Sequence, residues 1–224
     1  MQTLLNIFLA SRCPLCDRSA NKLLCQYCEK QLESCQLENP QELWKGNLPV
    51  FVWGNYEGAL KRAIASLKYD NKPEIGQLLG EWLGRSWLNS NLQKSKQKLV
   101  VVPIPLHSDK LRQRGYNQAA IIADTFAQIT RLPYKERGLI RNRDTKAQFG
   151  LSIAQRQDNL ANAFSLGKDF QKLPVGTQVL LIDDIYTTGA TTQAAAQILR
   201  QSGITVLGLG AIATPQKPPK DTQP

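Results

Sequence analysis

Two adjacent carboxylates, Asp183 and Asp184, stand just before a short loop of hydroxyl and glycine residues, 187–192, with the sequence TTGATT. An alanine-rich stretch, QAAAQILR, follows that loop and favours a helix. The backbone N–H groups of such a loop, the positive end of the helix dipole and the threonine hydroxyls all suit a bound phosphate. Gly189 would let the backbone approach the anion closely. The loop therefore predicts a phosphate-binding site.

The two carboxylates have a different role, because like charges repel and the acids cannot hold the phosphate themselves. Their oxygens suit ribose hydroxyls, or a Mg²⁺ ion that the phosphate also binds. A solvated strand end could also place two acids before a polar stretch. The full ordered string of strand, acids, loop and helix favours the functional interpretation, whereas a bare pair of acids would not.

The element that must position these residues is the apolar run Val179–Ile182, which Pro174 and Gly176 bound upstream. A continuous apolar run with β-branched members predicts a strand buried on both faces, as a parallel sheet requires. The acids and the loop then lie at the carboxyl end of that strand, which is where ligands bind in open α/β sheets.

A second buried strand is predicted at Leu99–Val102, and a basic stretch follows it closely. Arginine forks and lysine suit pyrophosphate oxygens, so this stretch is expected to form the second half of the site. Its candidate residues are Lys110, Arg112 and Arg114. A helix is predicted after them, from about Tyr116 to Ile129.

A polar and basic segment, 137–164, precedes the signature strand. Its candidate pyrophosphate or lid residues are Arg141, Arg143 and Lys146. We interpret the segment as a mobile lid that closes over a polyphosphate and excludes water. An ordinary solvated surface stretch is the alternative, since runs of charge are usually that.

Four of the five cysteines form two CxxC pairs, Cys13 with Cys16 and Cys25 with Cys28. Two such knuckles complete a tetrahedral sulfur set for Zn²⁺, and a segment this short needs a metal to fold. Two disulfides or four reduced thiols are the alternatives, and disulfides are improbable in the cytoplasm. Four cysteines leave zinc no open position, so a structural role is expected. Cys35 lies outside the pattern.

Composition predicts a globular protein with one sizeable core and a small appendage. The chain has 224 residues, of which 42% are hydrophobic and 21% charged, and its formal charge is +10. The basic balance suits a polyanionic partner, either a phosphorylated metabolite or nucleic acid. No apolar run approaches the roughly 20 residues of a membrane span. The apolar start lacks a basic region, which favours a packing helix over a signal peptide and predicts a cytoplasmic protein.

Further elements complete an alternating strand and helix order. A short strand at Val50–Trp53 leads into an amphipathic helix, and a second helix is predicted at about Pro73–Leu88. The tryptophans of that second helix, Trp82 and Trp87, are interpreted as core residues, with base stacking as the alternative. A final strand is expected at Ile204–Ala213; its GxGxxA pattern has no helix after it, which argues against dinucleotide binding. No P-loop motif occurs.

The chain resembles the ComF family of competence-associated, phosphoribosyltransferase-like proteins. The resemblance rests on the paired CxxC motifs and on YEGALKRAIASLKYD, VVPIPLHSDKLRQRGYNQ, RNRDTKAQ with QRQDNLANAF, and VLLIDDIYTTGATT, in that order. It implies an α/β protein of the type I phosphoribosyltransferase fold, a parallel Rossmann-like core with helices on both faces, behind a small zinc module held by four cysteines. The expected division is an N-terminal helix and zinc module at 1–40, a phosphoribosyltransferase-like domain at 41–213 and a disordered tail at 214–224.

The string VLLIDDIYTTGATT resembles the signature of type I phosphoribosyltransferases. The resemblance implies that Asp183 and Asp184 bind the ribose hydroxyls of phosphoribosyl pyrophosphate (PRPP). It also implies that the loop holds the 5′-phosphate through Thr187, Thr188, Gly189, Ala190 and Thr191. The family further implies a link to natural transformation and to incoming single-stranded DNA, and it supplies no confirmed acceptor.

Two classes of function follow. As an enzyme, the protein would hold PRPP with Mg²⁺, transfer its ribosyl carbon to an unidentified nucleophile and release pyrophosphate, mostly by positioning and electrostatics. As a non-catalytic protein, it would be a nucleic-acid-binding adaptor, acting with single-stranded DNA or with proteins of DNA uptake and recombination, or a PRPP sensor without turnover.

Overall fold

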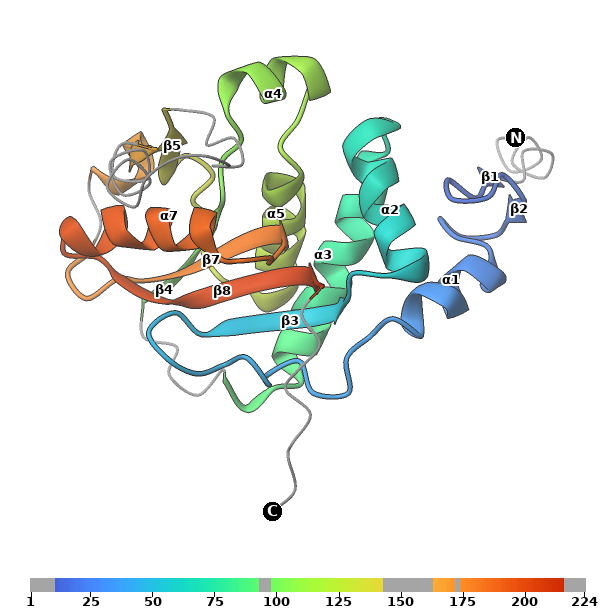
Figure 1. Cartoon of the computed structure of the whole chain (residues 1–224), viewed down its shortest axis with the longest axis horizontal. Helices are drawn as coiled ribbons and strands as arrows, with labels where there is room; N and C mark the ends of the chain where they lie inside the picture. The colour runs from blue at the N-terminus through green and yellow to red at the C-terminus, as the bar shows by residue number, and fades with distance from the viewer. Residues whose placement is uncertain (1–10, 93–97, 143–162, 172–173, 216–224) are drawn as a thin grey trace, which may run out of the picture.

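The computed structural model describes residues 11–92, 98–142, 163–171 and 174–215 (Figure 1). The strands are β1 (Ser11–Arg12), β2 (Ser19–Ala20), β3 (Val50–Asn55), β4 (Leu99–Pro103), β5 (Leu139–Arg141), β6 (Phe164–Leu166), β7 (Gln178–Ile185) and β8 (Thr205–Thr214). The α-helices are α1 (Gln26–Glu33), α2 (Gly58–Tyr69), α3 (Pro73–Leu88), α4 (Ser108–Arg114), α5 (Gln118–Thr130) and α7 (Ala190–Gln201).

A four-stranded parallel sheet forms the centre of the molecule, with the strand order β3-β8-β7-β4. Helix α7 covers one face of this sheet, and α3 and α5 cover the other (Figure 1). All four strands are parallel, so their carboxyl ends meet at one edge. The predicted α/β architecture with helices on both faces is confirmed.

Strand β7 is buried on both faces, as its apolar run predicts. Leu180 and Ile182 belong to the apolar cluster that contains α2, α3 and α5. Val179 and Leu181 belong to the cluster that contains α7. Alternation of side chains along a strand divides the four residues between the two layers, and burial on both sides fixes the position and register of β7.

The tryptophans of α3 are core residues. Trp87 is 1% exposed, and its ring meets that of Phe51 edge to face at a centroid distance of 5.2 Å. Trp82, which is partly buried, stacks on Trp53 at 5.2 Å. The core interpretation is therefore confirmed, and these rings are not placed for base stacking.

The structure adds elements that periodicity did not predict. The basic stretch after β4 forms the short helix α4, which His107 caps by accepting a hydrogen bond from the Asp109 backbone N–H. Helix α5 begins at Gln118, two residues later than predicted, because the side chain of Asn117 accepts from the backbone N–H of Ala119 and acts as its N-cap. Strand β8 ends at Thr214, one residue past the predicted boundary.

The expected N-terminal helix and most of the expected tail lie outside the described residues. Among the helices that the structure does describe, none combines the length and the apolar character needed to cross a membrane.

Candidate functional site

The loop after β7 turns directly into helix α7. Gly189 occupies the N-cap position with φ of +76°, a left-handed conformation that favours glycine. A Cβ atom on Gly189 would also lie 2.8 Å from the ring of Tyr186. Among the residues that the structure describes, no side chain caps this helix, so the N–H groups of its first turn are available for an anion, as the helix dipole favours. Thr187 and Thr188 are exposed beside them.

The two acids lie at the carboxyl end of β7 but on opposite faces of it. Asp183 lies on the same face of β7 as Val179 and Leu181, the face toward α7, and is half-buried. Asp184 follows the other side, toward α2, and is 8% exposed. The backbone N–H of Asp184 donates to Oδ1 of Asp183 over 2.9 Å. The acids and the phosphate-type loop therefore share one end of the sheet.

The electrostatics of the acid pair are asymmetric. Burial, and then the neighbouring charge of Asp184, raise the pKa of Asp183 to about 7. The backbone N–H of Asp184 and the cations Lys68 and Arg141 oppose that rise in pKa. Asp183 can consequently hold a proton near neutral pH and act as either a donor or an acceptor toward a hydroxyl group.

Asp184 is paired with a lysine that the sequence reasoning did not select. The Nζ atom of Lys68, on α2, lies 2.7 Å from Oδ2 of Asp184, and both side chains are largely buried. Helical periodicity shows only that Lys68 lies off the apolar stripe of its own helix. No local pattern relates it to a carboxylate on β7, so only the tertiary fold identifies the pair.

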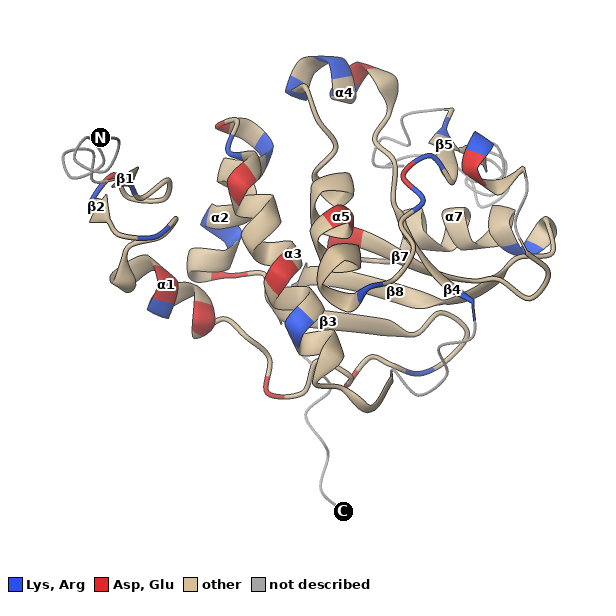
Figure 2. Cartoon of the chain, turned by 180° about the vertical axis from the view of Figure 1, so that it is seen from behind, with Lys and Arg blue, Asp and Glu red and all other residues tan. Residues whose placement is uncertain are grey.

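The predicted basic residues after β4, Lys110, Arg112 and Arg114, lie on helix α4 (Figure 2). Lys110 and Arg112 are exposed, and Arg114 is partly buried. Arg112 forms an ion pair with Asp109 on the same helix. The guanidinium of Arg114 lies 5.6 Å from the ring centroid of Tyr69, at the end of α2. Tyr116 donates from its hydroxyl to the backbone oxygen of Leu67 over 2.5 Å. Helix α4 is therefore tied to the end of α2 that carries Lys68.

The third group of predicted cations is only partly described. Arg141 ends β5, lies 5.6 Å from the ring centroid of Phe164 and acts on the charge of Asp183. Arg143 and Lys146, and with them most of the predicted lid, lie outside the described residues. Among the predicted lid residues that the structure describes, Arg141 is therefore the one whose positive charge lowers the pKa of Asp183.

A buried amide lies at the start of α5. Gln118 is 1% exposed, and its Nε2 donor has no hydrogen-bond partner among the residues that the structure describes. Sequence reasoning missed this residue, because the first turn of an amphipathic helix gives no sign of which polar side chain will be enclosed. An unsatisfied buried donor is costly and is unusual in a folded protein.

A cavity of about 830 Å³ lies beside α4, α5 and β5. Its lining includes Leu106, Tyr116, Tyr134 and Ile140. Strand β5 contributes Leu139 and Ile140 to this lining, and neither Asp183 nor Asp184 belongs to it.

The four predicted cysteines form one cluster. The Sγ atoms of Cys13, Cys16, Cys25 and Cys28 all lie within 4.8 Å of one another, so the cluster could hold a metal ion. All are free thiols rather than disulfides. A backbone hydrogen bond from Cys28 lowers the pKa of Cys25 to about 7. Cys35 lies apart and donates to the backbone oxygen of Gln31.

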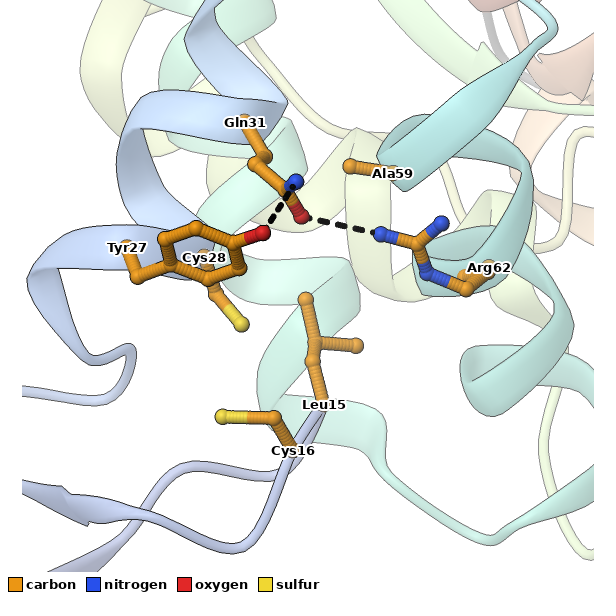
Figure 3. A pocket seen from close by; sticks show the side chains of 7 residues that line it. All are labelled: Leu15, Cys16, Tyr27, Cys28, Gln31, Ala59 and Arg62. Atoms are coloured by element: carbon orange, nitrogen blue, oxygen red, sulfur yellow. Dashed lines mark hydrogen bonds between the residues drawn. The ribbon is translucent and has the colours of Figure 1, made fainter.

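A polar contact docks the cysteine cluster onto the core. Gln31, on α1, donates to the hydroxyl of Tyr27 over 3.1 Å and accepts from Arg62 of α2 over 3.0 Å. Figure 3 shows both bonds beside a pocket of about 300 Å³ that Cys16 and Cys28 also line. The cysteine module therefore rests on α2, the same helix that carries Lys68 at its other end.

Sequence comparison places the chain among proteins named for competence and DNA utilization. No family model matches the chain. It is 27% identical over 201 residues to "Competence protein F" of Haemophilus influenzae, with 89% of this chain and 84% of that protein covered. It is 28% identical over 200 residues to "DNA utilization protein YhgH" of Escherichia coli K12, covering 85% of each. Identity to "Competence protein ComFC" of Streptococcus pneumoniae is 28% over 193 residues, covering 85% of this chain and 75% of that protein.

Structural comparison finds phosphoribosyltransferases. Adenine phosphoribosyltransferase from Saccharomyces cerevisiae matches with a TM-score of 0.43 and 14% identity, covering 85% of this chain and 89% of that one. The glutamine PRPP amidotransferase of B. subtilis matches with a TM-score of 0.38 and 21% identity, covering 61% of this chain and 26% of that one.

Proposed function

We propose that this chain, which belongs to the ComF family of competence proteins, binds PRPP at the carboxyl end of β7. The observation that carries the proposal is the continuous arrangement of Asp183, Asp184 and a loop that enters α7 through Gly189. A sugar that carries a phosphate group would use both parts of this arrangement. The first-turn N–H groups suit the 5′-phosphate, and the acids suit the ribose hydroxyls.

Transfer of the phosphoribosyl group is the proposed reaction. A nucleophilic acceptor would form a bond to the anomeric carbon, while the bond from that carbon to the pyrophosphate oxygen breaks and pyrophosphate leaves with the electron pair. The loop at Thr188 would anchor the phosphate, and Asp183 and Asp184 would fix the ribose. Catalysis would come mainly from positioning and from charge stabilisation. Mg²⁺, when bound with PRPP, would neutralise charge on the pyrophosphate.

Charge stabilisation of the leaving group would come from Arg141 and from the cations of α4. Arg141 already acts on Asp183. Arg112 and Arg114 lie on α4, where an exposed ion pair and a contact with Tyr69 occupy them. Such surface contacts are weak, about 1 kcal/mol or less, so a pyrophosphate could readily compete for both guanidinium groups.

The decisive measurement for the binding step is calorimetric titration with PRPP in the presence of Mg²⁺. We expect binding by the wild-type chain and at least a tenfold loss of affinity when Asp183→Asn and Asp184→Asn are combined. Asp124→Asn is the matched control, because Asp124 lies on the exposed side of α5 and bonds only to Gln128 among the described contacts. Absence of PRPP binding, or unchanged binding by the double variant, would contradict the proposal.

Turnover requires a separate measurement, since a PRPP sensor would bind the same ligand without consuming it. Release of pyrophosphate should be followed across a panel of bases, amines and nucleotides. Release that depends on one acceptor, and that Asp183→Asn abolishes, supports the enzyme. PRPP binding without release for any acceptor supports the sensor.

The cysteine cluster is proposed to hold a structural Zn²⁺. The Sγ atoms of Cys16 and Cys25 are 3.5 Å apart, close to the edge of about 3.8 Å in a tetrahedron with Zn–S bonds of about 2.3 Å. Sulfur is the donor that zinc prefers in closed sites of this kind. The residues present therefore fit the ion, and they leave it no position for substrate.

Binding of single-stranded DNA is a second candidate function. The formal charge of +10 and the exposed cations of α4 favour it, and relatives named for competence and DNA utilization give it a context in DNA uptake or recombination. Affinity for a single-stranded oligonucleotide should fall steeply as salt is raised, through counterion release. A flat salt dependence, or no binding at low salt, would exclude it.

A further inference from the structure

A sheltered ion pair joins helix α2 to the acidic end of β7. Lys68 Nζ and Asp184 Oδ2 are 2.7 Å apart, and their side chains are only 19% and 12% exposed. Ion pairs with this degree of burial constrain both partners far more than exposed pairs do, because either charge alone would be poorly solvated. Lys68 therefore fixes the position of the Asp184 carboxylate.

The contacts of the two acids use one oxygen of each carboxylate. Oδ1 of Asp183 accepts from the backbone N–H of Asp184 over 2.9 Å, and Oδ2 of Asp184 meets Lys68. Within the described part of the chain, the remaining oxygen of each carboxylate makes no hydrogen bond or ion pair. The pair thus offers one remaining acceptor atom on each of two adjacent residues.

We propose that Lys68 is a positioning residue that holds Asp184 so that these two oxygens receive two neighbouring hydroxyl groups of a ribose 5-phosphate moiety. The inference rests on the proposed PRPP site and adds to it a residue and a source of sugar selectivity. Two vicinal hydroxyls match two acceptors. A 2-deoxyribose would leave one carboxylate oxygen desolvated and without a hydrogen-bond donor. Sites built to bind a hydroxyl group discriminate strongly against a ligand that lacks it.

The arrangement depends on the lysine because Asp184 would otherwise be a poorly solvated negative charge beside Asp183. Repulsion between the two carboxylates would then turn one of them away from the common sugar. A guanidinium at position 68 would preserve the positive charge while changing its geometry. Lys68→Arg should consequently retain part of the preference for ribose over 2-deoxyribose that Lys68→Met loses.

Lys61 provides a matched control on the same helix. It precedes Lys68 by one heptad, so both residues lie on the same face of α2. Lys61 is exposed, and its Nζ atom lies 5.9 Å from the ring centroid of Tyr56 rather than near an acid. Lys61→Met removes the same charge and the same hydrogen-bond donors without touching the acid pair.

The test is competition against PRPP by ribose 5-phosphate and by 2-deoxyribose 5-phosphate. We expect the wild-type chain and Lys61→Met to prefer the ribose compound by at least about tenfold. Lys68→Met should reduce that preference to less than about threefold, and Lys68→Arg should give an intermediate value. The ratio of the two affinities isolates the hydroxyl contact, because both competitors carry the same phosphate. Unfolding midpoints should be measured for each variant.

Two results would overturn the inference while leaving PRPP binding intact. They are equal affinity of the wild-type chain for the two sugars, and an unchanged ratio of the two affinities in Lys68→Met. An unchanged ratio with weaker binding of both sugars and a lowered unfolding midpoint would assign Lys68 a purely structural role. Failure of the wild-type chain to bind PRPP itself would instead refute the proposed function, and the inference with it.

Discussion

A side-chain carbon placed on Gly80 would lie 2.5 Å from the backbone oxygen of Ile122. Helices α3 and α5 therefore approach one another at a distance that only glycine permits. Gly76 and Gly84, one turn to either side along α3, face α5 side chains in the same way. This close packing builds the layer that supports α2 and one face of the sheet.

Gly80→Ala is expected to destabilise the fold, although alanine favours helices by about 1 kcal/mol over glycine. The added methyl group meets a backbone atom that cannot rotate away, so α3 and α5 must separate, at a cost of about 1–3 kcal/mol. The Cβ atom of Gly76→Ala meets only side-chain atoms of Ile121 and Leu67, at 3.0 Å or more, so this variant should cost less. Denaturant unfolding of both variants checks this, and equal stabilities would contradict it.

Asp183→Asn should change how stability depends on pH. The pKa of Asp183 is raised to about 7 from 3.8, so the folded chain holds this proton more tightly than the unfolded chain. Its contribution to stability is complete below about pH 4 and is lost as pH rises through about 7. An asparagine has no such proton to lose. The variant should therefore gain stability relative to wild type between about pH 5 and 8, by at most about 4 kcal/mol.

Denaturant unfolding at several pH values measures that difference, and Asp124→Asn serves as the exposed control. Parallel stability curves for Asp183→Asn and the wild-type chain would show that the carboxyl group of Asp183 titrates normally in the folded state.

The sequence predicted the parts of the molecule whose local pattern has one interpretation. The run Val179–Ile182 is apolar without interruption, so it predicts a strand buried on both faces, and β7 is that strand. Helix α3 spans Pro73–Leu88, the predicted bounds, because proline occupies its first turn and its apolar residues repeat at helical spacing. The four-cysteine cluster follows from spacing alone.

The missed features depend on contacts between distant segments. Helix α4 has seven residues and buries none of them, so it has no apolar stripe from which to predict it. Lys68 and Gln118 are polar residues on amphipathic helices, where the expected position is solvent. Their enclosure follows from what packs above them in the fold, and a single sequence does not encode that locally.

Metal content should separate the cluster cysteines from Cys35. We expect one zinc per chain in the wild-type protein and in Cys35→Ser, because Cys35 bonds to the backbone oxygen of Gln31 rather than joining the cluster. Cys16→Ser should lose most of the zinc, since a hydroxyl is a poor substitute for thiolate at such a site. Elemental analysis of the purified proteins measures this. Zinc-free wild-type protein, or equal zinc in all three, would contradict it.

Gln118→Met should stabilise the protein. The Nε2 donor of Gln118 is buried without a partner in the described residues, which costs about 1–3 kcal/mol. Methionine has a similar length and shape and no donor, so a gain of about 1 kcal/mol is expected with PRPP affinity unchanged. Gln128→Met, on the exposed side of the same helix, should change stability by less than about 0.5 kcal/mol. Lower PRPP affinity in Gln118→Met would instead identify the amide as a ligand of the bound molecule.

Gly189→Ala should weaken PRPP binding more than its effect on stability explains. Gly189 and Gly46 both have φ of +76°, so alanine at either position incurs the same backbone strain of about 1–2 kcal/mol. A Cβ atom on Gly46 meets nothing within 4 Å, whereas one on Gly189 lies 2.8 Å from the Tyr186 ring, inside the loop that enters α7. Both variants should therefore lose stability, Gly189→Ala somewhat more because of the Tyr186 contact, and a loss of PRPP affinity of at least about tenfold is expected in Gly189→Ala alone. Equal PRPP affinities in the two variants would show that this loop does not hold the phosphate.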